Sequence, residues 1–447
     1  MGAANMDFIT QFENTLEHTI LQGAYGDSHQ LLQTFATTQM PYTLRLYSLI
    51  NDLRACEQPF SVPITGKRFR VLVYKTGNFI LDYIAGQFAS FFKEKGYTLF
   101  VFDPADMEFC SNKLFDFLKD GLDGAFFFNN VGLLQKLADG KNLWETIHVP
   151  CFNLLVDHPM YYADSLDFAP ARTTLLCADR THVSYALRFY PNIDRAVFFP
   201  TGGEIAPEMK TEWQERPFDV LFIGSYKEHP DALCDEASAF IAKYLQYHTD
   251  EPFESAVTAY AMQHAQKNEK SNPCIKDDML KTMIETHRFS ETNLTAQYRK
   301  DILKQIVDGG ITVHVYGSGW EQSGLSQHPN FILHDPVSFR EGLTLMSQTK
   351  ILLNHMAWFK CGSSERIFNA MSQGALCLTD SSIYLDRILT DNKNCALYSL
   401  NDVNTTLIAD RIRTLLSSEE TSKTIAQNGY VTSQEHTWHS HINAYLY

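Results

Sequence analysis

A short segment near the C-terminus, residues 359–380, combines residue types that can bind a phosphate group. It begins with small and hydroxyl-bearing residues, Gly362, Ser363 and Ser364. A glycine lets a ligand approach the backbone closely, and a serine caps a helix whose first amides then point outward. The positive end of the helix dipole favours an anion at this position. The segment therefore predicts a diphosphate-binding turn at the start of a helix.

The charged residues of the same segment fit this interpretation. Glu365 and Arg366 fall in the first helical turn. Asn369 lies four positions after Glu365, so that both side chains can face one ligand. A capped helix with a solvated Glu-Arg pair is the alternative, and the spacing alone does not exclude it.

A second group of chemical interest is Asp157 and His158. They follow an expected strand at 150–156, and Pro159 prevents further strand pairing. A carboxylate or an imidazole at the end of a strand can take a proton from an attacking hydroxyl group. The two residues are therefore candidates for a general base. The alternative is that Asp157 caps the next turn and that His158 packs structurally.

Strands and helices alternate around these segments. Apolar runs predict strands at residues 69–74, 98–102, 124–128, 150–156, 174–177, 196–199, 218–223, 312–316, 331–334, 351–354, 375–379 and 395–398. Helical spacing predicts a helix at 79–95, and another at 364–373 that ends at Gly374. This alternation is typical of parallel sheets with helices on both faces, the doubly wound α/β architecture.

The chain divides into four expected parts. They are a helical cap at 1–65, a first Rossmann-like domain at 66–205, a second at 206–430 with a helical insertion at about 228–307, and a helical tail at 431–447. Two such domains can face a cleft at the carboxyl ends of their sheets. That arrangement suits transfer from an activated donor to a separate acceptor. A nucleotide phosphorylase or an epimerase would use it too.

The composition is that of a folded, acidic protein. The 447 residues are 45% hydrophobic, and 37 basic against 52 acidic residues give a net charge of −15. Such a chain repels nucleic acid, so no nucleic-acid partner is expected, whereas peripheral membrane association stays open. No apolar run is long enough to cross a membrane, and no leader segment is evident, so we expect a cytoplasmic protein. The nine cysteines lack the spacing of zinc ligands, and no metal site is expected.

The segment from Ser364 to Asp380, Ser-Glu-Arg-Ile-Phe-Asn-Ala-Met-Ser-Gln-Gly-Ala-Leu-Cys-Leu-Thr-Asp, resembles the donor-binding helix of GT-B-type glycosyltransferases. The likeness is closest to the bacterial branch of spore-maturation glycosyltransferase-like proteins among the group 1 glycosyl transferases. Other stretches fit this branch in the expected order: 157–159, 179–183, 199–203, 222–225, 315–320 and 435–438. The cap and the insertion lie outside the likeness.

The resemblance implies the GT-B fold and transfer of a sugar from a nucleotide-sugar, with UDP as the expected nucleotide. The acceptor would be a hydroxyl or similar group on a glycan, a protein or a small molecule, and no cofactor or metal would be obligatory. The diphosphate would lie at Gly362, Ser363 and Ser364 and be neutralised by Arg366 or Lys360. The other donor-binding candidates are Gly224, Ser225, Tyr316, Gly317, Ser318, Trp320, Val337, Glu365 and Asn369.

One feature departs from the pattern of this family. Many retaining relatives carry two glutamates eight positions apart, where this chain has Cys361 and Asn369. Asn369 can still bond a ribose hydroxyl, but the stereochemical outcome stays open. An epimerase or hydrolase of sugar nucleotides with the same fold, or a non-catalytic sugar-nucleotide-binding module, are the alternatives. The sequence does not determine the oligomeric state.

Overall fold

The computed structural model describes residues 69–446 except 137–139, 194, 205–210, 269–274, 357 and 404. The expected helical cap at residues 1–65 lies outside the described residues. Contacts divide the chain into two units, and the second consists of residues 156–163, 177–189 and 197–447. Every candidate site residue named above belongs to this second unit. The four-part division proposed from the sequence stays a prediction.

The first sheet has six strands in the order β2-β1-β3-β4-β5-β6. The strands are β1 (Arg70–Tyr74), β2 (Thr98–Phe102), β3 (Gly124–Phe128), β4 (Cys151–Leu155), β5 (Thr173–Cys177) and β6 (Arg195–Phe198). The helices between them are α4 (Phe79–Glu94), α5 (Met107–Lys119), α6 (Leu143–Thr146), α7 (Ala163–Leu166) and α8 (Arg180–Phe189). Strand β1 pairs in parallel with β2 and β3, and β3 with β4. All five residues of β3 are buried, as expected of a strand covered on both faces.

The second sheet also has six strands, in the order β12-β11-β10-β7-β8-β9. They are β7 (Phe218–Ile223), β8 (Val313–Tyr316), β9 (Phe331–His334), β10 (Thr349–Leu353), β11 (Leu376–Thr379) and β12 (Ala396–Leu397). Every neighbouring pair in this sheet is parallel. This is the strand order of a Rossmann fold, in which the chain runs outward from β7 and then returns to β10 on its other side.

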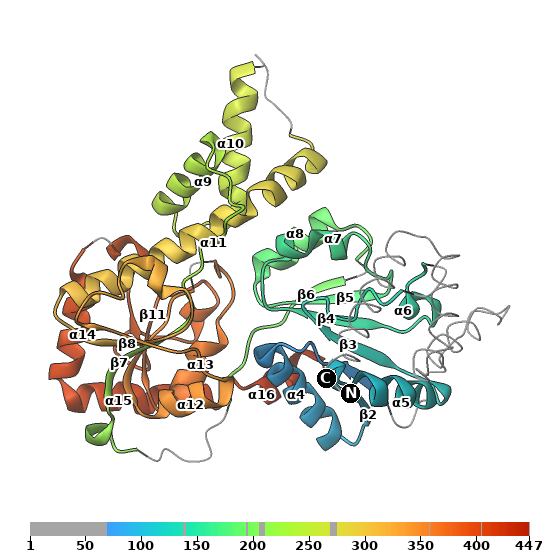
Figure 1. Ribbon diagram of the computed structural model, residues 1–447, viewed down its shortest axis with the longest axis horizontal. Coiled ribbons are helices and arrows are strands. Elements are labelled where there is room, and N and C mark those ends of the chain that lie inside the picture. The colour runs from blue at the N-terminus through green and yellow to red at the C-terminus, as the bar shows by residue number, and fades with distance from the viewer. Residues whose placement is uncertain are drawn as a thin grey trace, which may run out of the picture. The chain divides into compact units, whose positions relative to one another are not determined.

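Alternating residues of the second sheet fill two separate cores. Val220 and Phe222 of β7 point to one face, where they pack with α11 (Asp277–Asp308), α14 (Leu407–Ser417) and α15 (Glu419–Ser433). Leu221 points to the other face, where it packs with α13 (Glu365–Ser372). Helix α12 (Phe339–Ser347) contacts α13 and β10. Figure 1 shows these helices on the two sides of the sheet.

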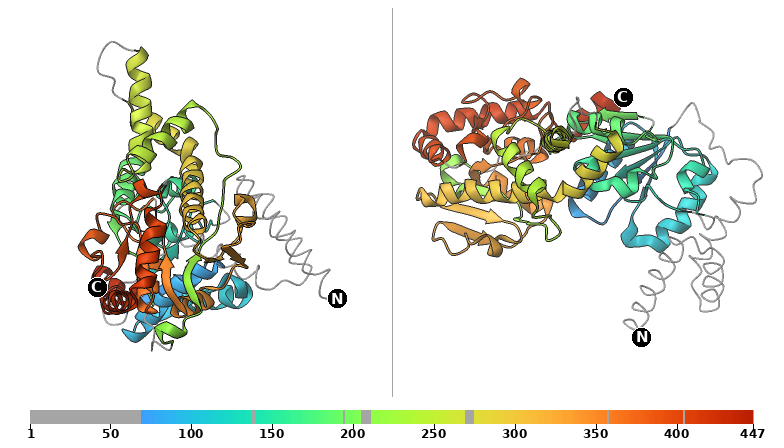
Figure 2. Two further views of the ribbon diagram at one scale, coloured as in Figure 1. Left: turned by 90° about the vertical axis from the view of Figure 1, so that its left-hand side faces the viewer. Right: turned by 90° about the horizontal axis from the view of Figure 1, so that it is seen from above.

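Three helices interrupt the second sheet between β7 and β8, and we call them the helical insertion. They are α9 (Glu236–Tyr247), α10 (Phe253–Asn268) and α11, whose C-terminal half packs on the sheet through Tyr298, Ile302 and Ile306. Its N-terminal half carries α9 and α10 away from the sheet (Figures 1 and 2). The single long helix α11 thereby joins the insertion rigidly to the sheet.

The expected strands and the alternation of strands with helices are confirmed, with ends that shift by one or two residues. Helix α13 begins after its N-cap Ser364 and ends before Gly374, whose φ of 75° requires a glycine. A last helix, α16 (Trp438–Leu446), lies in the expected C-terminal tail. Within the described residues, no helix is long and apolar enough to cross a membrane.

Candidate active site

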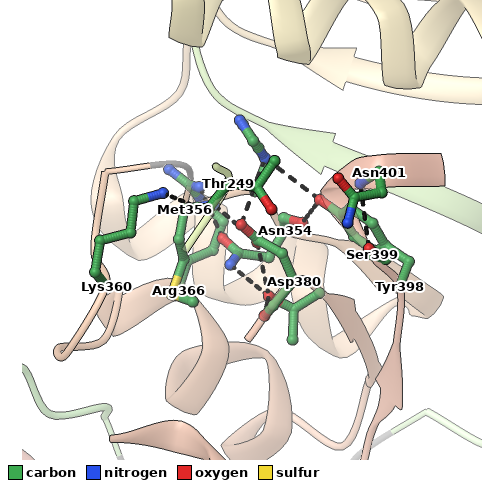
Figure 3. Close-up of polar contacts among 11 residues, drawn as sticks. Thr249, Asn354, Met356, Lys360, Arg366, Asp380, Tyr398, Ser399 and Asn401 are labelled. Carbon is green, nitrogen blue, oxygen red and sulfur yellow. Dashed lines mark hydrogen bonds and ion pairs between the residues drawn. The ribbon is translucent and has the colours of Figure 1, made fainter. Parts of the chain in front are cut away.

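The carboxyl ends of β10 and β11 carry a buried polar frame in the second unit (Figure 3). Asn354 follows β10, and its Nδ2 donates to Thr379 Oγ1 at 2.9 Å. The Tyr398 hydroxyl donates to the Asn354 carbonyl at 2.8 Å. Asp380 follows β11 and accepts the Met356 backbone N–H at 2.9 Å. The frame lies at the carboxyl ends of the neighbouring strands β7 and β10. The connections that follow these two strands lead to opposite sides of the sheet, and open α/β sheets bind ligands at such a point.

Arg366 reaches this frame from the first turn of α13. Its backbone N–H donates to the side chain of the N-cap Ser364, which fixes the start of the helix. Its Nη1 donates to Asn354 Oδ1 at 3.0 Å. Its Nη2 also lies 3.9 Å from the place where a side chain on Gly224 would begin. The guanidinium group therefore lies between the ends of β10 and β7.

A second guanidinium group comes from Arg299 of α11. Its Nη1 donates to the carbonyl of Ser225, just after β7, at 2.8 Å. Its buried Nε has no hydrogen-bond partner among the described residues. Burial, reinforced by the positive charge of Arg366, lowers the pKa of Arg299 to about 9. Two positive charges thus lie at the same edge of the sheet, and burial removes that of Arg299 from water.

His355 and Lys360 complete the cluster. Burial and the charges of Arg299, Lys360 and Arg366 hold the pKa of His355 well below its usual range, so its imidazole is neutral. Its Nε2 has no partner in the part of the chain that the structure describes. Lys360 Nζ donates to the Thr249 carbonyl at 2.6 Å. Burial lowers the pKa of Lys360, although the negative charge of Asp380 acts in the opposite direction. An anion bound here would relieve the repulsion among the cations and supply their missing partners.

Two glycine-containing turns border the cluster and contact one another. The Gly224 N–H donates to the Tyr316 carbonyl, and Ser318 Oγ donates to Ser225 Oγ at 3.0 Å. A side chain at Gly317 would place its Cβ 2.2 Å from the Gly224 oxygen, so only glycine fits there. The structure therefore brings together the predicted nucleotide-binding residues of β7 and β8.

The aromatic candidates have different surroundings. Trp320 is fully buried, and its indole N–H donates to the Gly224 carbonyl at 2.8 Å. Its ring packs beneath the turn at Gly224 and exposes no surface on which a base could stack. Tyr316 is half-buried and stacks on His334 at a centroid distance of 4.2 Å. Val337 lies in the turn before α12, next to the N-cap Ser338.

The predicted diphosphate turn is packed against other parts of the second unit. The Cys361 N–H donates to Asp179 Oδ2 at 2.8 Å, and Gly362 forms a β-bridge with Asp179. Ser363 is fully buried, and its carbonyl accepts the Thr201 hydroxyl. Asn369 Oδ1 accepts the Glu204 backbone N–H at 2.8 Å. These contacts already use groups of Gly362, Ser363 and Asn369 that the sequence assigns to a ligand, whereas Glu365 and Arg366 stay half-buried.

Comparisons with known proteins concern residues 299–446 and the fold. A family model described as glycosyl transferase-like matches residues 299–446, which include Arg299, Lys360 and Arg366. Sucrose-phosphate synthase from Thermosynechococcus elongatus has the same fold, with a TM-score of 0.50 at 10% sequence identity over 84% of this chain and 97% of that chain. Residues 299–446 thus form a glycosyl transferase-like domain, and the chain as a whole has the GT-B fold.

Two further solved structures are similar to this chain at lower scores. A glycosyltransferase from Rickettsia africae covers 85% of this chain and 97% of its own, with 9% identity and a TM-score of 0.46. HepE from Anabaena, solved with UDP and glucose, covers 85% of this chain and 98% of its own, with 9% identity and a TM-score of 0.45. No curated protein sequence matches the chain.

The two base candidates, Asp157 and His158, have partners within the second unit. His158 is buried, its Nδ1 accepts the Met160 N–H at 3.1 Å, and its Nε2 lies 3.2 Å from Glu254 Oε1. Burial lowers the pKa of His158, but the nearby carboxylates outweigh it and the net shift is upward. Asp157 is half-buried, and its Oδ2 accepts the Tyr162 hydroxyl at 2.8 Å.

The sequence analysis missed four residues of the cluster. Asn354, His355 and Asp380 follow β10 and β11, and their position at strand ends is a signal that could have found them. Arg299 carries no such signal, because it stands in a long polar helix. No group of three or more His, Cys, Asp or Glu side chains in the described part of the chain is arranged as a metal site.

Proposed function

We propose that the protein is a glycosyltransferase that binds a nucleoside-diphosphate sugar with its diphosphate between Arg299 and Arg366 and close to Lys360. The observation that carries this proposal is the convergence of two guanidinium groups on one buried frame, with Arg299 Nε unpartnered. Burying like charges together costs free energy unless an anion neutralises them. A diphosphate does so with several acceptor oxygens, which match the fork of an arginine.

We assign the nucleoside to the paired turns of β7 and β8. Ser225 and Ser318 present hydroxyls there, and Gly317 lets the two turns pack closely against each other. Tyr316, His334 and Val337 border the same edge of the sheet and would contact the base. UDP as the nucleotide, and the spore-maturation-like branch, rest on the resemblance of the sequence.

The reaction would be substitution at the anomeric carbon of the sugar. The oxygen of an acceptor hydroxyl forms the new glycosidic bond, the bond from the anomeric carbon to the diphosphate breaks, and the nucleoside diphosphate leaves with the electron pair. Arg299, Lys360 and Arg366 stabilise the charge that develops on the leaving group. Asp157 and His158 are the proposed acceptors of the hydroxyl proton. Of the two, Asp157 is the more accessible.

The acceptor would be a glycan, a protein or a small molecule in the cytoplasm. The net charge of −15 supports an acceptor that is not itself strongly anionic. We keep Ser364 and Glu365 beside the donor at the start of α13, which presents Arg366. Gly362, Ser363 and Asn369 already bond other parts of the second unit, and they would support this turn rather than bind the donor.

A thermal-shift panel tests the donor assignment. The protein is heated with UDP-, GDP-, dTDP- and CMP-linked sugars, and the last of these serves as the monophosphate control. A diphosphate donor at a hundred times its dissociation constant should stabilise the fold by about 2.7 kcal/mol. The same donor should lose most of this effect in the Arg299→Met variant. Stabilisation by none of the diphosphate donors, or equal stabilisation of wild type and variant, would contradict the proposal.

A product assay then separates transfer from the other reactions of this fold. The donor that stabilises the protein is incubated with and without a panel of acceptors, and the products are separated by chromatography. We expect sugar transfer that requires an acceptor. Release of free sugar, or conversion of the sugar, without any acceptor would indicate a hydrolase or an epimerase instead.

A further inference from the structure

His355 carries a buried imidazole whose two ring nitrogens have different surroundings. Only 2% of the residue is exposed. Its Nδ1 lies 3.4 Å from the Tyr398 hydroxyl and 3.7 Å from Asp380 Oδ2. Its Nε2 is buried and has no hydrogen-bond partner among the described residues. A buried polar atom of this kind costs free energy until a ligand or a water satisfies it.

The surroundings of Nδ1 indicate which nitrogen carries the hydrogen of the neutral ring. The Tyr398 hydroxyl donates to the Asn354 carbonyl at 2.8 Å, so its oxygen can only accept a hydrogen bond from His355. The Asp380 carboxylate also accepts and does not donate. Both neighbours therefore favour the hydrogen on Nδ1, which leaves a lone pair on Nε2. The oxygen of an anion would be repelled by this lone pair.

The groups that face His355 carry mostly positive charge. Its titratable and charged neighbours are Tyr298 and Arg299 of α11, Lys360 and Arg366 after β10, Asp380 after β11 and Tyr398 after β12. We call Arg299, Lys360 and Arg366 the cation cluster. Burial and the charges of this cluster hold the pKa of His355 well below its usual range. A diphosphate bound among the same three cations would offset their charges and so favour a proton on the imidazole.

We propose that a nucleotide-sugar binds together with one proton, which His355 takes up from solvent at Nε2 and presents as a hydrogen bond to an oxygen of the diphosphate. The proposal rests on the proposed function, because it places the diphosphate in the cation cluster. An anion oxygen satisfies the unpartnered Arg299 Nε directly, but it satisfies His355 Nε2 only when that nitrogen carries a hydrogen. The proton and the donor then raise each other's affinity, and the leaving group gains a further charged hydrogen-bond donor.

Calorimetric titration of the full-length protein with UDP-glucose tests this coupling. UDP-glucose is the suitable probe because its diphosphate is esterified at both ends, whereas a terminal phosphate titrates at about pH 6. The titration is repeated at about pH 7 in Pipes, Hepes and Tris, whose ionisation enthalpies differ, so that the observed enthalpies give the number of protons taken up. We expect about half a proton to one proton per bound UDP-glucose, and an affinity that falls by up to about tenfold per unit between about pH 6 and 8.

A variant at His355 tests whether this residue takes up the proton. His355→Gln keeps an N–H donor on the side chain but cannot take a proton. It should bind UDP-glucose without proton uptake and with an affinity nearly independent of pH. His439→Gln, on an exposed position of α16, is the matched control and should keep the proton uptake of wild type.

The outcomes separate this inference from the proposed function. Binding of UDP-glucose by wild type without proton uptake would overturn the inference and leave the proposed function intact. Equal proton uptake in His355→Gln and wild type would also overturn it, because another group would then take the proton. Should His355→Gln fail to fold, the buffer series on wild type decides the inference. If UDP-glucose does not bind, the series is repeated with GDP-mannose and dTDP-glucose, and binding of none of the three would refute the proposed function and the inference with it.

Discussion

Replacing Arg366 with alanine is the sharpest test of the cation cluster. The variant removes a guanidinium group that donates to Asn354 Oδ1 at 3.0 Å and, in our proposal, to the diphosphate. A hydrogen bond to a charged group contributes about 1.5–3 kcal/mol. The dissociation constant of UDP should therefore rise about 10–150-fold, since 1.4 kcal/mol corresponds to a factor of ten. Turnover should fall at least roughly tenfold, because the leaving group loses one stabilising donor.

The fold should tolerate this change. The variant loses the hydrogen bond to Asn354, which costs about 0.5–1.5 kcal/mol. It also removes the positive charge that helps to lower the pKa of Arg299, and this relief offsets the loss. Alanine is moreover a good residue for the first turn of a helix such as α13. We therefore expect the free energy of unfolding to change by less than about 1 kcal/mol.

Thermal shift with UDP separates binding from stability. At a UDP concentration one hundred times the wild-type dissociation constant, wild type gains about 2.7 kcal/mol, and a variant with tenfold weaker binding gains about 1.4 kcal/mol. Arg413→Ala, on an exposed position of α14, is the matched control and should behave as wild type. An unchanged UDP affinity in Arg366→Ala would refute the assignment. A large loss of stability without UDP would show that Arg366 holds the fold instead.

Three further predictions follow from the same contacts. Because burial and the charge of Arg366 lower the pKa of Arg299 below its ordinary value, the folded chain holds this charge at a cost in free energy. Arg299→Met should therefore raise the free energy of unfolding in urea while it weakens UDP binding, and a variant less stable than wild type would contradict this reasoning. Gly317→Ala should destabilise the fold by about 1–3 kcal/mol in urea denaturation, because its Cβ would lie 2.2 Å from the Gly224 oxygen. The control is Gly86→Ala on α4, where a Cβ meets nothing within 4 Å, and this variant should be slightly more stable than wild type. Equal effects of the two substitutions would show that the turn at Gly317 can adjust without cost. Asp157→Asn should lower turnover about a hundredfold at a nearly constant melting temperature, because the amide still accepts the Tyr162 hydroxyl but cannot take a proton. If Tyr162→Phe lowers turnover as much, Asp157 holds Tyr162 in place and is not the base.

The architecture of the second sheet could be predicted from the sequence because its signals are local. The apolar run at Phe218–Ile223 is long enough for one strand and is followed by a glycine. Helix α13 has its N-cap Ser364 at one end and Gly374 at the other, and both residues act through their own backbone. The alternation of such elements is enough to predict parallel sheets.

The details of the site depend on contacts that no local pattern records. Trp320 follows a glycine turn like a residue that stacks on a base, yet its indole is buried and donates to Gly224. Ser363 looks like part of a phosphate-binding turn, yet Thr201 already donates to its carbonyl. In each case the partner lies about a hundred residues or more away along the chain, so neither composition nor local spacing can indicate the contact.

The sequence by itself determined the kind of sheet, the order of its elements and the helix that presents Arg366. Only the tertiary structure decided that Arg299, from the far end of a long insertion helix, meets Arg366 at the same edge of that sheet. The physical reason is that strand and helix formation depend on neighbours within a few positions. The cost of burying a charge, and the ligand that would relieve it, depend instead on which distant groups folding brings within a few ångströms.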